Sequence, residues 1–253
     1  VEVRTELRFG VVLVNFTGDA PPIDEWLSPW ATLVGRDSAV DRLVPAVDSE
    51  GVALIETRTV AANWKTYQEN ASINILHEAF THALYRKSPE VPRVDNQRNR
   101  RYQTYMEDCL VAFSHSRKDS GQTYDEYPLP SAGHDINQQP ANGYVTTLYP
   151  NINVPALDVM LKDNIVIPLS PGETLLQHLR FYQPEALATE AFFAEEARVQ
   201  TLFDTVHYED QLAIEAVQTA RCSPVWTQHY YAPFWDALHH RFNQLLMTDL
   251  LVG

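Results

Sequence analysis

Four short runs rich in β-branched, aromatic and leucine residues follow one another between residues 144 and 182. They cover 144–148, 157–161, 164–168 and 174–182, with Pro150, Pro168 and Pro171 at or near their ends. Short, regularly spaced runs with proline breakers are typical of antiparallel strands. Other strand-like runs lie at 7–14, 52–60 and 102–114, whereas 186–203, 207–221 and 233–250 have helical periodicity. Strands grouped apart from helices predict an α+β fold.

Composition and charge exclude several classes of protein. The chain has 253 residues, 45% of them apolar, so it can bury a sizeable core without disulfide or metal support. Its net charge of -14 disfavours nucleic acid as a partner. No apolar run approaches the roughly 20 residues that cross a bilayer, so we expect no membrane partner. Cys109 and Cys222 stand in no CxxC or CxH pattern, which predicts reduced thiols in a cytoplasmic protein.

One stretch of this acidic chain is basic. It holds Arg86, Lys87, Arg93, Arg98, Arg100 and Arg101. A solvated loop is one interpretation, and a docking patch for an acidic redox partner is another, because clustered charge steers association.

The segment 64–77 carries an unusual polar pattern. We predict a helix here, with Asn63 as its N-cap. Asn70, Asn74 and His77 are spaced four and three residues apart, so on a continuous helix they share one face. Two amides and an imidazole on one face indicate a site, and a solvent-facing side of an amphipathic helix is the alternative.

His77 and His82 raise the question of a metal. In the H-E-x-x-H motif of zinc proteases the two histidines are four residues apart, about 40° around a helix. Here they are five apart, about 140°, so both can reach one metal only if the helix ends or bulges between them. The spacing therefore disfavours a zinc protease and makes Glu78 a poor general base.

A third ligand is needed, and for iron(II) the recurrent set is two histidines and one carboxylate. The candidates are Glu209, Asp210 and Glu215. Asp210 aligns with the apolar residues Ile214 and Val217 at spacings of four and three, where an uncompensated carboxylate is costly. Glu209 and Glu215 reach solvent more easily, and His207 is an alternative ligand.

These residues resemble the catalytic domain of the Rieske-type ring-hydroxylating oxygenase α subunits. The family's pattern of Asn-Trp-Lys, Glu-Asn and two spaced histidines is met by Asn63-Trp64-Lys65, Glu69-Asn70, His77 and His82. Its carboxylate, strand and turn motifs are similar to Glu209-Asp210 with Glu215 and Gln218, to Tyr149-Pro150-Asn151, and to 168–174. The resemblance spans almost the whole chain, and 1–20 is similar to the exit from the family's Rieske domain.

The resemblance implies a single catalytic domain over 1–253 with a helix-grip fold, an antiparallel sheet curved around a long helix. It implies a mononuclear iron(II) held by His77, His82 and Asp210, with Asn70 and Asn74 as further catalytic positions. The implied reaction uses dioxygen to hydroxylate, dihydroxylate or demethylate an aromatic or other small apolar substrate. Electrons are expected from a Rieske cluster and a reductase, within a homotrimer.

Two departures from the family pattern matter. Neither cysteine has a histidine two or three residues away, so the [2Fe-2S] Rieske cluster is expected on another segment or chain. The family usually has an acid three residues before the first histidine ligand, where this chain has Asn74. An amide cannot replace a carboxylate in relaying charge. A helix-grip module that binds hydrophobic ligands without redox turnover is therefore the alternative function, and a zinc hydrolase using the same three residues is a third.

Overall fold

A central antiparallel sheet organises the molecule. The computed structural model describes residues 3–71, 73–83, 102–116, 129–233 and 235–252. Eight strands of these residues form the sheet: β3 (Val44–Pro45), β4 (Ile55–Val60), β5 (Tyr102–Glu107), β6 (Leu110–Ser116), β7 (Asn142–Leu148), β8 (Ile152–Asn153), β9 (Leu161–Ser170) and β10 (Glu173–Tyr182). Their order is β3-β10-β9-β8-β7-β6-β5, with β4 also pairing β10. Residues 157–160, predicted as part of a strand, precede β9 instead.

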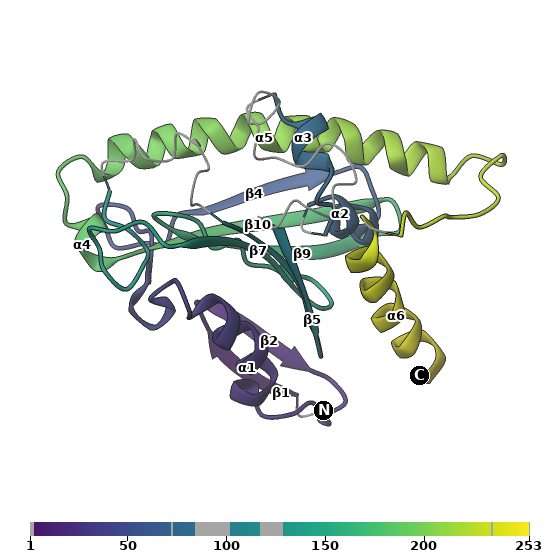
Figure 1. Cartoon of the computed structure of the whole chain (residues 1–253), viewed down its shortest axis with the longest axis horizontal. Coiled ribbons are helices and arrows are strands. Elements are labelled where there is room, and N and C mark those ends of the chain that lie inside the picture. Colours follow the sequence, from purple (N-terminus) through teal and green to yellow (C-terminus); the bar gives the residue numbers. More distant parts are fainter. Residues whose placement is uncertain (1–2, 72, 84–101, 117–128, 234, 253) are drawn as a thin grey trace.

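One long helix crosses a face of this sheet (Figure 1). Helix α5 (Phe192–Arg221) has 30 residues, where the sequence predicted two helices with a break near 204–206. No glycine or proline interrupts this segment, so nothing in the chain stops the helix there. Its buried residues are Phe192, Glu196, Val199, Asp210 and Ile214, which recur at the three- and four-residue spacing of one helix face. The antiparallel sheet and the long helix confirm the predicted helix-grip α+β fold.

The other face of the sheet is covered by the N-terminal unit. It comprises α1 (Ile23–Val34), which packs its buried Trp30 against the sheet, and a two-stranded sheet of β1 (Arg4–Arg8) and β2 (Val11–Asn15). The single strand predicted at 7–14 is wrong, because Phe9 and Gly10 both adopt positive φ and close a two-residue hairpin turn. The strand predicted at 102–114 is likewise a hairpin, β5 and β6, which turns at Asp108 (φ 46°).

Strand alternation decides which side chains face α5. Side chains of β9 and β10 point alternately to the two faces of the sheet. Five of these side chains lie on the face toward α5, where they contact α5 or one another: Lys162, Asn164, His178, Arg180 and Tyr182. Leu161, Leu179 and Phe181 lie between them in sequence and pack on the side of α1. Much of the layer beneath α5 is therefore polar, with the apolar Val166 and Leu176 packed on Ile214 of α5, whereas the layer beneath α1 is mainly apolar.

The helix predicted at 64–77 is interrupted. Helix α2 (Trp64–Ala71) ends early, and α3 (His77–Thr81) begins after an irregular stretch. Ile73 and Ile75 are both buried in one core cluster with Phe242 of α6 (Ala237–Val252). On a continuous helix, residues two apart point in nearly opposite directions, so burial of both isoleucines in one core excludes helix there. The shared helical face predicted for Asn70, Asn74 and His77 is therefore wrong.

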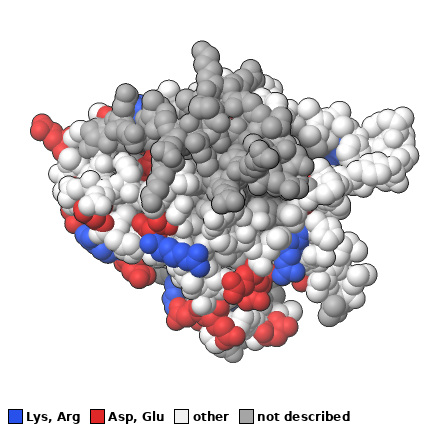
Figure 2. All heavy atoms as spheres, in the orientation of Figure 1, with Lys and Arg blue, Asp and Glu red and all other residues white. Residues whose placement is uncertain are grey.

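The remaining elements are short. They are η1 (Val40–Arg42) and α4 (Pro184–Leu187). The basic stretch 86–101 lies outside the residues that the structure describes. Within the described ranges, no helix is both long and apolar enough to span a membrane. On the face that Figure 2 shows, acidic and basic side chains are interspersed over the lower half of the molecule.

Candidate metal centre

His77, His82 and Asp210 come together beneath α5, although they are far apart in the sequence. Asp210 Oδ1 lies 3.7 Å from His77 Nε2 and 3.5 Å from His82 Nε2. One ligand atom of each residue lies within 4.8 Å of the other two, and all three residues are buried. Two ligands held at right angles around one metal at about 2.1 Å are roughly 3 Å apart. The three atoms thus lie close to the spacing of a single metal centre.

The backbone explains how a five-residue spacing serves one site. His77 is the first residue of α3, which ends at Thr81, and His82 adopts an extended conformation with ψ of 121°. The two rings lie edge to face with their centres 5.1 Å apart. The helix therefore ends between the two histidines, as the spacing requires.

Each histidine has its second ring nitrogen fixed by an oxygen atom. His77 Nδ1 lies 2.5 Å from the backbone carbonyl oxygen of Asn74, and His82 Nδ1 lies 3.1 Å from Glu209 Oε2. These oxygens accept hydrogen bonds from Nδ1–H, so the lone pair of each Nε2 faces Asp210. The sequence suggested that Glu209 reaches solvent, but its carboxylate orients His82 and also accepts from the backbone N–H of Ala83.

The two asparagines take different positions. Asn70 Nδ2 donates a hydrogen bond to Asp210 Oδ1 over 2.8 Å, so this amide holds the carboxylate. Asn74 contributes its backbone carbonyl to His77, and the residue lines a cleft of about 180 Å³ together with Asn70 and Glu69. Both residues thus lie beside the histidine and carboxylate group. Their contacts differ from those expected if Asn70, Asn74 and His77 shared one helical face.

The surroundings favour neutral imidazole at His82. Burial lowers the pKa of His82, and the charges of Asp210 and Glu209 act in the opposite direction. A neutral imidazole is the form that binds a metal.

The later residues of the carboxylate motif join α5 to α2. Gln218 Oε1 accepts hydrogen bonds from the backbone N–H of Asn63 and the hydroxyl of Thr66, both 3.0 Å away. Glu215 Oε1 accepts from the backbone N–H of Ala61 over 3.1 Å. These bonds set the position of α5 against the segment that leads to Asn70, and so set Asp210 against Asn70.

A second group of candidate ligands lies in the same layer. Glu56, His178 and His207 bring one ligand atom each within 4.8 Å. His207 therefore does not join His77 and His82, as the alternative ligand assignment required. Lys162 Nζ lies 2.8 Å from His207 Nε2.

His178 and Lys162 were missed from the sequence. The signal was available in β10, where His178 and Arg180 replace apolar residues at alternating positions of a buried strand. Lys162 gives the same signal in β9, where it is buried beside Leu161. An ionisable residue in a run that otherwise reads as buried strand indicates a partner or a ligand.

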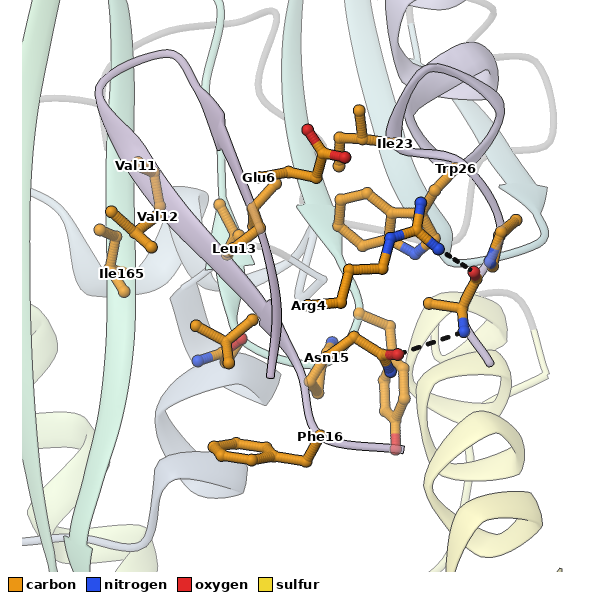
Figure 3. Close-up of a pocket in the computed structure, with 17 residues that line it drawn as sticks. Arg4, Glu6, Val11, Val12, Leu13, Asn15, Phe16, Ile23, Trp26 and Ile165 are labelled. Carbon is orange, nitrogen blue, oxygen red and sulfur yellow. Dashed lines mark hydrogen bonds between the residues drawn. The ribbon is translucent and has the colours of Figure 1, made fainter. Parts of the chain in front are cut away.

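A separate cleft of about 470 Å³ lies between the β1–β2 hairpin, the start of α1 and the sheet. Figure 3 shows that Arg4 and Asn15 line it, each bonded to the backbone of Ala20, with Trp26 and Ile165 nearby. None of its lining residues belongs to the histidine and carboxylate group.

Comparisons with known proteins show the family and the fold of the chain. The family model for the ring hydroxylating α subunit (catalytic domain) matches residues 36–250. A quaternary ammonium Rieske monooxygenase in complex with an inhibitor is similar to this chain, with a TM-score of 0.69 and 14% identity over 97% of this chain and 61% of that one. Naphthalene 1,2-dioxygenase from Rhodococcus sp. bound to indole gives a TM-score of 0.64 and 14% identity over 97% and 65% of the two chains.

A third related structure is the terminal oxygenase of carbazole 1,9a-dioxygenase from Nocardioides aromaticivorans IC177. It has a TM-score of 0.54 and 18% identity over 96% of this chain and 66% of that one. No curated protein sequence matches the chain. The chain spans about three-fifths of the length of the monooxygenase. With the family model matching from 36 to 250, this chain belongs to the family of ring-hydroxylating α-subunit catalytic domains.

Proposed function

We propose that residues 1–253 are the catalytic domain of an oxygenase in which His77, His82 and Asp210 hold one iron(II). The observation that carries the proposal is the fixed orientation of both imidazoles, whose Nδ1 atoms are paired with oxygens while their Nε2 atoms face a buried carboxylate. Two imidazoles and one carboxylate are the donor set of non-haem iron(II) oxygenases. Paired second nitrogens are typical of metal-ligating histidines.

The chain's residues would divide the work as follows. Iron(II) bound by this group would supply open coordination positions at which dioxygen is activated. Asn70 fixes the carboxylate of Asp210, and Glu209 fixes the ring of His82. Related structures include both a monooxygenase and dioxygenases. The proposed reaction is accordingly hydroxylation, dihydroxylation or demethylation of an aromatic or other small, mainly apolar substrate.

We further propose that electrons come from an external Rieske centre and enter near Asn74. The cleft of about 180 Å³ is lined by Asn70 and Asn74 and also by Glu69 and Asp236. Asn74 is in direct contact with His77 through its carbonyl oxygen. This contact connects the cleft to a proposed iron ligand through polar groups, although residue 74 is an amide rather than the carboxylate of the family pattern.

A homotrimer is the assembly we propose. The segment 222–233 after α5 projects from the body of the molecule, is uncharged, and exposes Val225, Trp226 and Tyr230 (Figures 1 and 2). Exposed aromatic side chains of this kind are typical of protein contacts. Light scattering on the purified chain tests the assembly, with three copies as the expected result.

The ligand-binding module without redox turnover is not favoured, because the chain belongs to a catalytic-domain family and keeps the three side chains in one place.

Iron binding tests the proposal directly. Anaerobic protein reconstituted with iron(II) should hold about one iron per chain. His77→Ala and Asp210→Ala should lose it, whereas His134→Ala, an exposed histidine bonded to the Gly35 carbonyl, should keep it. Wild-type protein that fails to bind iron, or that turns over with zinc and no reductant, would refute the assignment.

A further inference from the structure

Lys162 is a buried cation with no carboxylate partner among the described residues. It lies on β9 with 2% of its surface exposed. Its Nζ is 2.8 Å from His207 Nε2 and 4.2 Å from the centre of the Phe203 ring. Within the described part of the chain, no carboxylate forms an ion pair with it. An ammonium has three donors, so two of its N–H groups stay available. A buried charge in this state is costly unless a ligand compensates it.

The acids of this layer are already paired with arginines. Arg58 pairs with both Glu56 and Asp204, and Arg180 lies 2.7 Å from Glu196 and 3.7 Å from Glu56. Glu196 also accepts from the hydroxyl of Tyr182, and Glu56 accepts from Gln200 over 2.8 Å. Among the described cations of this layer, Lys162 therefore forms no ion pair with these acids and can pair with an external anion.

Two imidazoles beside Lys162 also have unused nitrogens. His207 Nε2 accepts from Lys162, which leaves the proton on Nδ1, and His178 donates from Nδ1 to Asn164 Oδ1 over 2.5 Å. Among the described residues, His207 Nδ1 and His178 Nε2 are buried without a hydrogen-bond partner. Buried polar atoms of this kind require a partner.

A metal does not suit this second group. The rings of His178 and His207 are stacked with their centres 4.6 Å apart and only 14° between their planes. The lone pair of an imidazole nitrogen lies in the plane of its ring, so two parallel stacked rings cannot both aim at one ion between them. The adjacent ammonium of Lys162 would also repel a cation. An anion meets the remaining N–H groups of Lys162, whereas His207 Nδ1 lies 3.9 Å from Glu56 Oε1.

The position of this group relates it to the proposed iron site. His207 and Asp210 lie three residues apart on α5, so their side chains are one helical turn apart and both turn toward the layer beneath α5. The charge of Asp210 acts on Lys162 and on the buried Tyr67 of α2. Lys162 and the proposed ligand Asp210 therefore lie close enough for the charge of one to act on the other.

We propose that Lys162, together with His207 and His178, binds a carboxylate of the substrate and so directs the rest of that molecule toward the iron ligands. This inference rests on the proposed function and narrows its substrate to a small organic acid with an apolar body. Lys162 supplies N–H donors to the carboxylate oxygens, His207 Nε2 holds the ammonium in place, and His178 Nε2 can accept a hydroxyl hydrogen. Phe203, packed on the Lys162 ammonium, offers apolar surface beside them.

Calorimetry with matched ligand pairs tests the inference. The probes are benzoate, phenylacetate, salicylate and hexanoate, each compared with its primary amide, at about pH 6. Burial lowers the pKa of Lys162 to about 7, so this pH keeps the ammonium charged. In wild-type protein at least one carboxylate should bind more than about tenfold more tightly than its amide, as loss of a charge-assisted hydrogen bond implies.

Two variants test whether the preference for carboxylates comes from Lys162 or from the overall charge of the protein. Lys162→Met should abolish the carboxylate preference, whereas Lys65→Met should keep it, because Lys65 lies over the Trp64 ring outside this layer. The wild-type comparison of acids with amides needs no variant, so it decides the matter even if Lys162→Met does not fold. No preference in any of the four wild-type pairs, or a preference unchanged in folded Lys162→Met, overturns the inference.

Iron binding is measured on the same samples. Lys162→Met should still bind about one iron per chain, because Lys162 is not in the proposed ligand set. Wild-type protein that binds iron but shows no preference for acids leaves the iron centre intact and removes the carboxylate site. Wild-type protein that prefers acids but binds no iron would support the carboxylate site and refute the iron centre.

Discussion

Glu209 acts on the proposed metal site through another residue. Its carboxylate contacts His82 Nδ1 and no atom of the other two proposed ligands. Partners of this kind set ligand orientation, and their loss typically lowers metal affinity about 10–100-fold. We expect Glu209→Ala to weaken iron(II) binding to that extent, measured by anaerobic competition with a chromogenic chelator.

A matched control is available on the same helix. Glu195 pairs with the exposed Arg198 near the start of α5 and has no contact with the histidines. Glu195→Ala should therefore leave iron affinity unchanged. Equal affinities in wild type and Glu209→Ala would show that His82 needs no carboxylate partner.

Asp163 should make stability depend on pH. Its side chain lies on the α1 side of the sheet near Trp30, and burial raises the pKa of this carboxyl to about 8. The folded state then keeps a proton that the unfolded state loses near pH 4. Stability should fall by up to about 1.4 kcal/mol per pH unit as the pH rises from about 4 to about 8.

Replacement by an amide removes this titration. Asp163→Asn should raise the unfolding midpoint at pH 8 more than at pH 5, measured by urea denaturation at both values. Identical pH slopes in the two proteins would rule out a protonated Asp163 in the folded state.

At the level of elements, α5 offers a comparison between a buried and an exposed ion pair. Glu196 is buried and forms hydrogen bonds with Arg180 and Tyr182, whereas Glu195 is half-buried and its partner Arg198 is exposed. Loss of one partner of a buried pair typically costs about 3–5 kcal/mol, and exposed pairs contribute about 0–1 kcal/mol. Glu196→Gln should therefore lower the free energy of unfolding by about 3 kcal/mol, and Glu195→Gln by less than about 1 kcal/mol. Similar losses in urea denaturation would mean that Arg180 finds another partner.

The sequence predicted the kinds of element better than their ends. Antiparallel strands and separate helical segments follow from local periodicity, and these suffice for the α+β fold, although periodicity predicted two helices where α5 is one. The break after Ala71 does not follow, because it depends on burial of both Ile73 and Ile75 against the distant α6. Likewise, Phe9 in a turn with positive φ lacks the Asn-Gly signal by which such turns are recognised.

Part of the candidate site could likewise be predicted from the sequence, and part could not. Residue types and spacing suggested a donor set with His77 and His82 but left several candidates for the carboxylate, and the family resemblance selected Asp210, which the fold brings to the two histidines. The contact between Glu209 and His82 joins two segments whose relative position only the fold determines. The same holds for Lys162 and His207, which meet because β9 passes beneath α5.

For the whole molecule, iron should act as a link between distant segments. The proposed ligands come from α3 and its end on one side and from α5 on the other, and the two helices are joined in the sequence through most of the sheet. A ligand that binds only the folded state stabilises it by RT ln(1 + [L]/Kd), about 2.7 kcal/mol at a hundredfold excess over Kd.

For a chain of this size, each kcal/mol shifts the midpoint of thermal unfolding by about 2–4 °C. Saturating iron(II) under anaerobic conditions should thus raise the midpoint by about 5–10 °C, and a chelator should reverse the change. Asp210→Ala should show no shift, because the carboxylate that joins α5 to the two histidines is gone. Lys162→Met should shift as the wild type does, since that side chain faces His207 rather than the ligand atoms. An equal shift in Asp210→Ala would mean that iron binds elsewhere, so the three residues would not form the link.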